Sequence, residues 1–139
     1  MSFLVDTNVI SEIRKGARAD QRVMRWLKET DDDDLRLSVL VLGELRQGVE
    51  RLRARDGASA QRLDHWLGGL AERYKGRILP VDEPVAQLWG RLNVPDPLPA
   101  VDGLLAATAL IHDLTLVTRN TRDVARTGAR LLNPFDRRG

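Results

Sequence analysis

Four acidic residues stand at positions from which they could share one site. Asp6 directly follows a short apolar run, Glu44 lies in an amphipathic segment, and Asp102 opens an apolar, alanine-rich segment. The fourth acid, Asp123, comes soon after another apolar run. Carboxylates brought close together repel one another unless a cation neutralises them, and Mg²⁺ and Mn²⁺ prefer oxygen ligands. The acids therefore predict a divalent metal site, provided that the fold brings them together.

Hydrolysis of a phosphodiester is the reaction that such a site suits. A bound divalent ion lowers the pKa of a coordinated water and neutralises the charge that builds up on the phosphate. Mg²⁺ usually keeps several waters and contacts only one or two carboxylates directly. Part of the acid set could therefore act through water.

Each acid also has a structural interpretation. Asp6 or Asp102 could cap or charge the start of a helix. Glu44 could be an exposed helix residue, and Asp123 could form a turn with Asn120. The joint placement of the four acids, rather than any single one, favours the metal site.

Composition limits the other classes of function. The 139 residues contain no cysteine, which excludes disulfides, thiolate metal sites and a cysteine nucleophile. No apolar run approaches the roughly 20 residues needed to span a bilayer, and no signal peptide is recognisable. We therefore expect a single domain over residues 1–139, located in the cytoplasm and without a membrane partner.

The charged residues allow a phosphate-rich partner without requiring one. There are 22 cations against 20 anions, so the net charge is only +2. Three of the cations are lysine and the remaining 19 are arginine, whose planar fork suits phosphate oxygens. Arg119 and Arg122, beside Asp123, are the candidates for contact with phosphate groups.

The pattern along the chain predicts alternating strands and helices, and hence an α/β fold with a mainly parallel sheet. Segments 94–99, which is rich in proline, and 31–34, which is four aspartates, are expected to be loops. Strands are expected at residues 3–6, 35–39, 77–81, 114–118 and 130–132. Helices are expected at residues 7–15, 20–29, 40–55, 59–75, 83–92 and 101–112, with a turn or short helix at 120–126.

These elements place the acids where a site could form. Ligands of parallel sheets collect at the carboxyl ends of the strands, where Asp6 lies and which Asp123 follows. In the helix expected at 40–55, Val41, Leu45, Val49 and Leu52 form the apolar stripe, and Glu44 lies off it. Gly48 shares the face of Glu44 and leaves space beside it.

Four segments resemble, in order and spacing, the motifs of PIN domains. The resemblance extends from about residue 3 to residue 135. The segments are 3–11 (FLVDTNVIS), 41–48 (VLGELRQG), 99–109 (PAVDGLLAATA) and 116–123 (LVTRNTRD). This similarity implies a PIN-like three-layer sandwich with the sheet between helices.

The resemblance is to the VapC type, the toxins of bacterial and archaeal toxin–antitoxin pairs. It implies an endoribonuclease that cuts single-stranded or loop RNA through a water activated by Mg²⁺ or Mn²⁺, leaving a 5′-phosphate and a 3′-hydroxyl. It implies that the four acids hold the metal, Asp6 and Asp102 directly and Glu44 and Asp123 directly or through water. Further residues would orient ligands and water: Asn8, Thr118 and Asn120.

The same resemblance implies the partners. They are an RNA substrate, a small VapB-like antitoxin that blocks the site, and a second copy of the chain in a homodimer. DNA would be contacted only indirectly, through the antitoxin.

The sequence departs from the family pattern at Gly103, where a better helix former is usual, and at Val124, where relatives often have Phe. We interpret both as local packing variation. A catalytically silent PIN-fold module that binds RNA or assembles with a partner is the alternative function. A phosphatase or response-regulator-like domain is disfavoured, because Asn8 and Arg119 stand where such domains need Asp and Lys.

Overall fold

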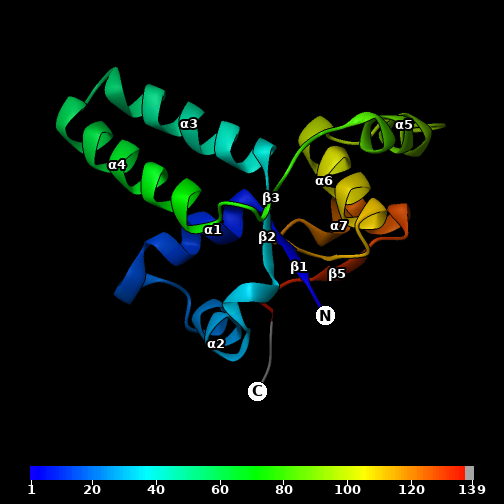
Figure 1. Ribbon diagram of the computed structural model, residues 1–139, viewed down its shortest axis with the longest axis horizontal. Coiled ribbons are helices and arrows are strands. Elements are labelled where there is room, and N and C mark those ends of the chain that lie inside the picture. The colour runs from blue at the N-terminus through cyan, green and yellow to red at the C-terminus, as the bar shows by residue number, and fades with distance from the viewer. Residues whose placement is uncertain (137–139) are drawn as a thin grey trace.

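The computed structural model describes residues 1–136 and contains one sheet of five parallel strands (Figure 1). The strand order is β3-β2-β1-β4-β5, so the first strand is central. The expected α/β fold is confirmed, and every strand pair is parallel. The strands are β1 (Phe3–Val5), β2 (Leu35–Ser38), β3 (Ile78–Leu79), β4 (Thr115–Val117) and β5 (Arg130–Leu132).

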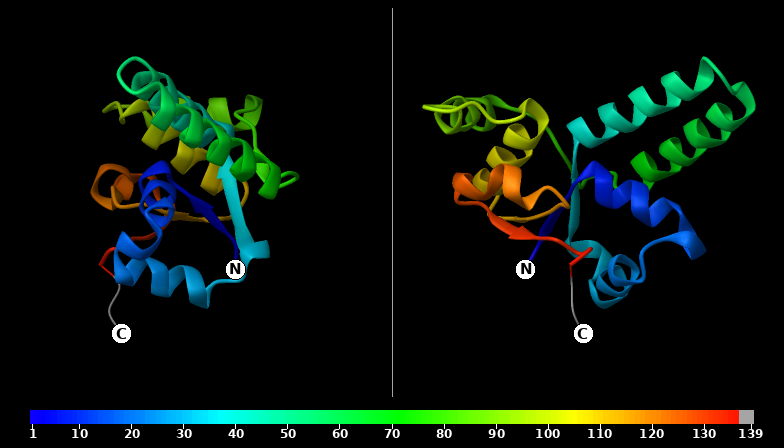
Figure 2. Two further views of the ribbon diagram at one scale, coloured as in Figure 1. Left: turned by 90° about the vertical axis from the view of Figure 1, so that its left-hand side faces the viewer. Right: turned by 180° about the vertical axis from the view of Figure 1, so that it is seen from behind.

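Helices cover both faces of this sheet, as expected for a three-layer sandwich (Figure 2). α1 and the hairpin of α3 and α4 lie on one side, whereas α6 and α7 lie on the other (Figures 1 and 2). The helices are α1 (Thr7–Arg14), α2 (Gln21–Glu29), α3 (Val39–Arg53), α4 (Gly57–Arg73), α5 (Glu83–Leu92), α6 (Ala100–Ile111) and α7 (Thr121–Val124). Single 3₁₀ turns lie at Gly16–Arg18, Asp32–Asp34 and Ala125–Thr127.

The central strands are apolar because both of their faces are covered. β1 pairs with β4 in the register Phe3↔Thr115, Leu4↔Leu116 and Val5↔Val117. Leu4, Val5 and Val117 are almost completely buried, and Trp26 of α2 packs its ring edge-on against Phe3. This core fixes the ends of β1 and β4, the strands that precede two of the acids.

Several helices begin at an aspartate or serine whose side chain accepts a backbone N–H, which supplies a partner that the first turn lacks. These N-cap residues are Asp6 for α1, Asp20 for α2, Ser38 for α3, Asp56 for α4 and Asp82 for α5. Gly16 and Gly76 follow α1 and α4 with positive φ angles, a conformation that glycine adopts readily after a helix. Among the described residues, no helix is both long and apolar enough to cross a bilayer.

Most element boundaries lie within one or two residues of the predicted ones, and three differences have a physical reason. The strand expected at 77–81 is reduced to Ile78–Leu79, because it is an edge strand paired only with β2. The helix expected at 59–75 begins two residues earlier, where Asp56 caps it. The four-aspartate run is a 3₁₀ turn rather than an irregular loop, and Asp32 in it accepts hydrogen bonds from two arginines.

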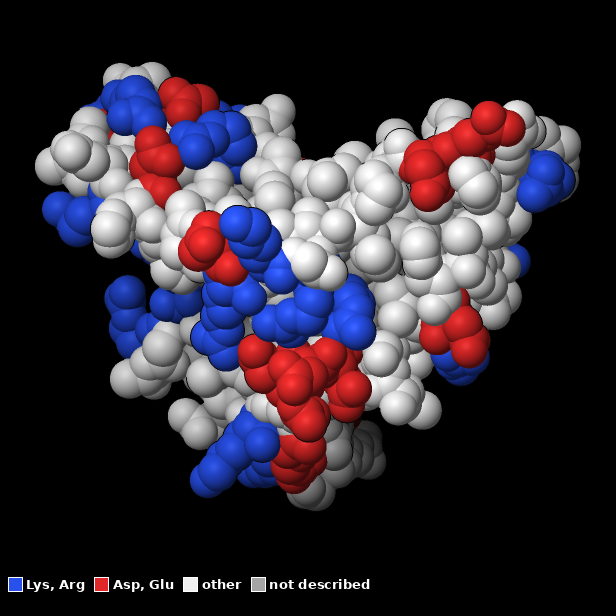
Figure 3. Space-filling view, viewed as in Figure 1, with Lys and Arg blue, Asp and Glu red and all other residues white. Residues whose placement is uncertain are grey.

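That aspartate turn is part of the packing at the edge of the sheet. Arg73 and Arg77 form ion pairs with Asp32. Arg77 also donates to the backbone carbonyls of Asp32 and Leu35. Figure 3 accordingly shows a cluster of acidic side chains bordered by basic ones. The acidic run is therefore tied to the fold by arginines from the end of α4 and the residues after it.

Candidate active site

Asp6 lies at the carboxyl end of β1 and is 4% exposed. Its Oδ1 accepts the backbone N–H of Thr7 at 2.7 Å, and its Oδ2 accepts the hydroxyl of Thr118 at 2.7 Å. The Asn8 amide lies 3.3 Å from the same Oδ2. Burial and, to a lesser extent, the charge of Glu44 raise the pKa of Asp6, whereas the hydrogen bonds from Thr118 and from the Thr7 N–H oppose the rise. Asp6 is thus both a helix cap and a carboxylate fixed at the end of the central strand.

Thr118 joins the neighbouring strand end to this acid. It follows β4, is 1% exposed, and its backbone N–H donates to the carbonyl of Leu132. Its hydroxyl donates to Asp6 and accepts the backbone N–H of Asn120 at 3.0 Å. The residues predicted to orient the acids therefore meet at the junction of β1 and β4.

Glu44 reaches this junction from α3. The predicted stripe is buried at Val41, Leu45 and Val49, which turns Glu44 away from the core. Its Oε1 accepts the hydroxyl of Thr7 at 2.6 Å. α3 and α1 are therefore connected at the point where Asp6 begins α1.

Asp102 lies in the first turn of α6, which has no side-chain cap. Burial, followed by the charges of Asp6, Asp123 and Glu44, raises its pKa to about 6, while a hydrogen bond from Asn120 works in the opposite direction. The charges of all three other acids thus act on this one carboxyl group.

A hollow of about 330 Å³ contains most of this arrangement. It lies between α3 on one side of the sheet and the start of α6 on the other. Figure 3 shows the molecule hollowed between the α3–α4 hairpin and the α5–α6 side. The lining residues are Asp6, Thr7, Asn8, Glu44, Gln47, Arg51, Asp102 and Asn120.

The fourth acid, Asp123, is peripheral in this structure. It lies on α7, is exposed and does not line the hollow, although its charge contributes to the raised pKa of Asp102. Within residues 1–136, no three acidic or histidine side chains converge closely enough to ligate one ion together. The acids are gathered in one region but are not packed as a closed metal cage.

The two arginines considered for phosphate contact differ. The guanidinium of Arg119 lies 4.3 Å from the centre of the Phe135 ring, and its backbone N–H donates to the Asn8 side chain. Arg122 is exposed on α7. Contact of either side chain with RNA stays a prediction.

Three lining residues were not anticipated from the sequence. Thr7 supplies the hydroxyl that holds Glu44, and Gln47 and Arg51 continue the wall of the hollow along α3. A signal was available for the last two, because positions three and seven residues after Glu44 lie on the same helix face.

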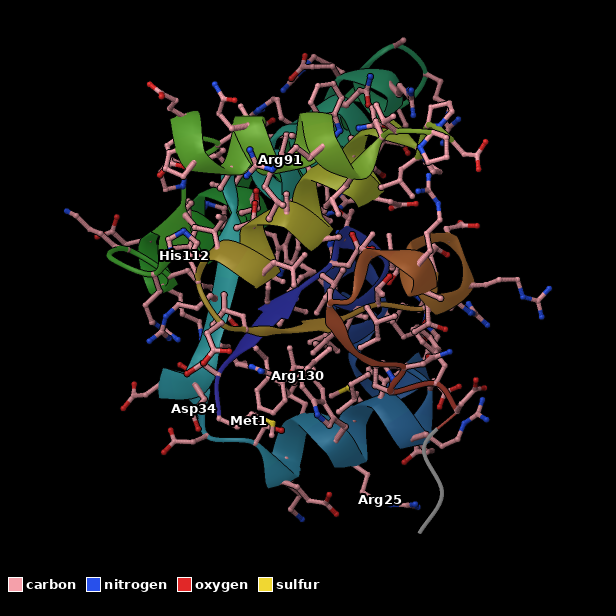
Figure 4. All side chains as sticks on the ribbon, turned by 90° about the vertical axis from the view of Figure 1, so that its right-hand side faces the viewer. Met1, Arg25, Asp34, Arg91, His112 and Arg130 are labelled. Carbon is pink, nitrogen blue, oxygen red and sulfur yellow. The ribbon has the colours of Figure 1, made fainter. Side chains whose placement is uncertain are left out.

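A larger hollow, of about 520 Å³, lies at the amino ends of the strands. Its walls include Met1, His112 and Arg130, which are labelled in Figure 4. Arg36 lines it too, and none of the four acids does. Arg130 there is paired with Asp113. We therefore place the candidate active site at the carboxyl edge.

Comparison with known proteins agrees with this geometry. The model of the PIN domain family matches residues 3–129. Toxin FitB of Neisseria gonorrhoeae is 35% identical, with 96% of this chain and 98% of that protein covered. The VapC ribonuclease Y4jK of Sinorhizobium fredii is 31% identical, with 96% and 98% covered. The crystal structure of FitAcB from Neisseria gonorrhoeae matches with a TM-score of 0.89 at 35% identity, covering 97% of this chain and 99% of that one.

A parallel α/β sheet with acidic side chains gathered at its carboxyl edge is the architecture of a PIN nuclease. The family match covers most of the chain, and the two relatives cover nearly all of it. The chain belongs to the PIN domain family and, within it, to the VapC/FitB group of ribonuclease toxins of toxin–antitoxin systems. The predicted fold, family and enzyme class are thereby confirmed.

Proposed function

We propose that this ribonuclease hydrolyses RNA at a Mg²⁺ or Mn²⁺ site made by four acids: Asp6, Glu44, Asp102 and Asp123. One observation carries the proposal: three of these acids line a single hollow, and the described residues provide no ion pair to any of the four. Carboxylates held together without an ion-pair partner are stabilised by a bound cation.

The residues present fit such an ion. All four donors are carboxylates, which suits the hard cations Mg²⁺ and Mn²⁺. The open spacing of the acids also suits Mg²⁺, which keeps several waters. We assign Asp6 and Asp102 as direct ligands, and Glu44 and Asp123 as ligands that act directly or through water.

When bound, the ion would lower the pKa of a water molecule and neutralise charge on the phosphate. The chain's own residues keep the acids in place for this. Thr118 and Asn8 fix the orientation of the Asp6 carboxylate, and Thr7 fixes that of Glu44. Glu44 Oε2 accepts no hydrogen bond from the described residues and can orient a water. Asn120 favours the charged form of Asp102.

We further propose the partners expected for this family. Two related structures are those of FitAcB and of FitAB bound to a DNA fragment, the latter 32% identical to this chain. By analogy, this chain would form a homodimer, be blocked by a VapB-like antitoxin, and contact DNA only through that antitoxin. Its RNA substrate would place its action in the cytoplasm. Arg119 and Arg122 remain candidates for contact with RNA phosphates.

The test is cleavage of total RNA by the wild-type protein and by Asp6→Asn, each with Mg²⁺, Mn²⁺ or EDTA. Asparagine still caps a helix, so the variant should fold. The matched control is Asp82→Asn, which alters another N-cap outside the site. We expect discrete, metal-dependent cuts from the wild type and from Asp82→Asn, and none from Asp6→Asn.

Two other outcomes have clear meanings. Equal cleavage by Asp6→Asn would show that the activity comes from elsewhere or from a contaminant. A folded wild type that binds RNA but cuts none, with either metal, would favour the catalytically silent module instead.

A further inference from the structure

One cation stands among the acids of the hollow. Arg51 lies on α3, seven residues after Glu44 and four after Gln47, and all three line the hollow. Seven residues are two helical turns, so Arg51 lies about 10 Å further along the same face of α3. The wall formed by α3 therefore changes from an acid at its inner end to an arginine at its outer end.

Arg51 is not engaged within the fold. Its side chain forms no hydrogen bond or ion pair with any other residue of 1–136, although three carboxylates line the same hollow. Other arginines of α3 behave differently. Arg46 and Arg53 both bind Glu50 on their own helix and Asp64 on α4. Those two arginines connect α3 to α4, whereas Arg51 faces the hollow without a partner among residues 1–136.

An unpaired guanidinium at this place suits a phosphate group. The carboxylates of the hollow repel a polyanion, and a divalent ion would offset that repulsion only at the inner end. A strand whose scissile phosphate lies at the acids must continue outward, and α3 forms one wall of the space available. Arginine binds phosphate oxygens through two parallel N–H groups.

We propose that Arg51 binds an RNA phosphate next to the scissile one, and that Gln47 between them contacts the intervening nucleotide. Arg51 thereby sets which bond of the strand lies at the acids. This inference rests on the proposed ribonuclease function of the same site.

The first test is direct binding, measured by fluorescence anisotropy of a labelled 12-nucleotide single-stranded RNA of mixed sequence. All proteins carry Asp6→Asn so that the RNA stays intact. We expect Arg51→Ala to weaken binding roughly tenfold, as for loss of a charge-assisted contact. The slope of log Kd against the logarithm of the salt concentration should fall by about 0.7, because one phosphate contact is lost.

The matched control is Arg55→Ala. Arg55 is another exposed arginine just beyond the end of α3, it does not line the hollow, and its side chain has no partner among residues 1–136. We expect it to change RNA affinity by less than about twofold, as for a surface charge outside the contact. An equal loss with both variants would overturn the proposal, because it would show general attraction rather than a defined contact.

The second test locates the phosphate. In an otherwise wild-type background with Mn²⁺, Arg51→Ala should raise KM while changing kcat little. Replacing single phosphates of a cleaved RNA by neutral methylphosphonates should identify one position, beside the cut, where wild type and Arg51→Ala no longer differ. The absence of any such position would also overturn the proposal.

Two remaining results separate the hypotheses. If Arg51→Ala leaves RNA binding unchanged but weakens binding of poly-glutamate, Arg51 is a site for an acidic protein and the proposal is wrong. If the wild type cuts RNA and Arg51→Ala matches it in KM, the ribonuclease function stands and only this inference fails. If the wild type neither binds nor cuts RNA, the proposed function fails.

Discussion

Thr118 connects the central strand, the fourth strand and the first acid through one buried hydroxyl. Replacement by valine keeps the shape of the side chain and removes all three hydrogen bonds of the hydroxyl, which link it to Asp6, to the Asn120 N–H and to the Asn8 amide. We expect the free energy of unfolding to fall by about 1–2 kcal/mol, because Asp6 and the Asn120 N–H lose a buried partner. The affinity for Mn²⁺ should fall at least about tenfold, as for loss of a residue that orients a ligand.

Urea unfolding and Mn²⁺ titration calorimetry check this prediction. Thr118→Ser is the control, since it retains the hydroxyl and should bind Mn²⁺ within about twofold of the wild type. Wild-type Mn²⁺ affinity in Thr118→Val would show that the orientation of Asp6 does not depend on this bond.

Asp102 makes the stability of the metal-free protein depend on pH. Its pKa in the folded state is about 6, against 3.8 as the ordinary value, so the folded state binds this proton more tightly. The resulting stabilisation is fully present below pH 3.8 and is lost as the pH rises through about 6. At neutral pH without metal, the ionised Asp102 therefore destabilises the fold.

Asp102→Asn should consequently raise stability at pH 7.5 in EDTA by about 1 kcal/mol, a value reduced because the group is partly exposed. This corresponds to a rise in Tm of roughly 2–5 °C. Differential scanning fluorimetry at several pH values measures it. The gain should vanish near pH 4, and Mn²⁺ should raise the Tm of the wild type more than that of the variant. A pH-independent gain would assign the effect to packing instead.

At the scale of the helices, two glycines that look alike in the sequence have different surroundings. A Cβ added at Gly103 of α6 would lie 3.2 Å from both Leu98 Cβ and Trp89 Cδ1. Leu98 cannot easily move, because its backbone N–H is bound to the Asn93 side chain. A Cβ at Gly48 of α3 would meet nothing within 4 Å. The close packing explains why the position after Asp102 departs from the usual helix former.

Alanine should therefore have opposite effects at these positions. Gly103→Ala should lower the free energy of unfolding by about 1–2 kcal/mol through overpacking. Gly48→Ala should raise it by about 0.5–1 kcal/mol, because alanine favours the helix. Chemical denaturation of both variants compares them directly. Stabilisation of Gly103→Ala would show that the contact with Leu98 relaxes freely.

The sequence predicted the elements well, and the misses have physical reasons. The apolar periodicity placed α3 and α4 to within two residues at each end. β3 was overestimated because apolar content at 77–81 does not reveal that only Leu37 and Ser38 are available for pairing. The aspartate turn was predicted as a solvated loop because its arginine partners lie about 40 residues away.

At the scale of the whole molecule, one core supports the structure. Buried residues from Leu4 to Phe135 form a single cluster that includes parts of every strand except β3 and β5, which pack against it. We therefore expect residues 1–139 to unfold as one domain. Urea unfolding should give one transition in which tryptophan fluorescence, which reports on Trp26, Trp66 and Trp89, coincides with circular dichroism. Two separate midpoints would show that the α3–α4 hairpin melts independently.

The candidate site was predictable to the extent that topology determines it. Asp6 and Asp123 follow parallel strands, so their place at the same edge of the sheet could be inferred from sequence. The peripheral place of Asp123 and the hydroxyl of Thr7 on Glu44 depend on side-chain geometry. A helical arginine is usually solvated, so the spacing of seven residues from Glu44 does not by itself assign Arg51 to the site. The three-dimensional hollow does so, whereas Arg53 is engaged by Glu50.

The position of β4 between β1 and β5 has a consequence during translation. Until residues 115–117 are made, β1 has only β2 as a neighbour, and a chain that has emerged through α5 has neither Asp102 nor Asp123. A nascent copy on the ribosome therefore has no complete set of acids. On the proposed four-acid site, a chain that ends before β4 would lack Asp123 as well as the strand beside β1, so we expect such a truncated chain to cleave no RNA.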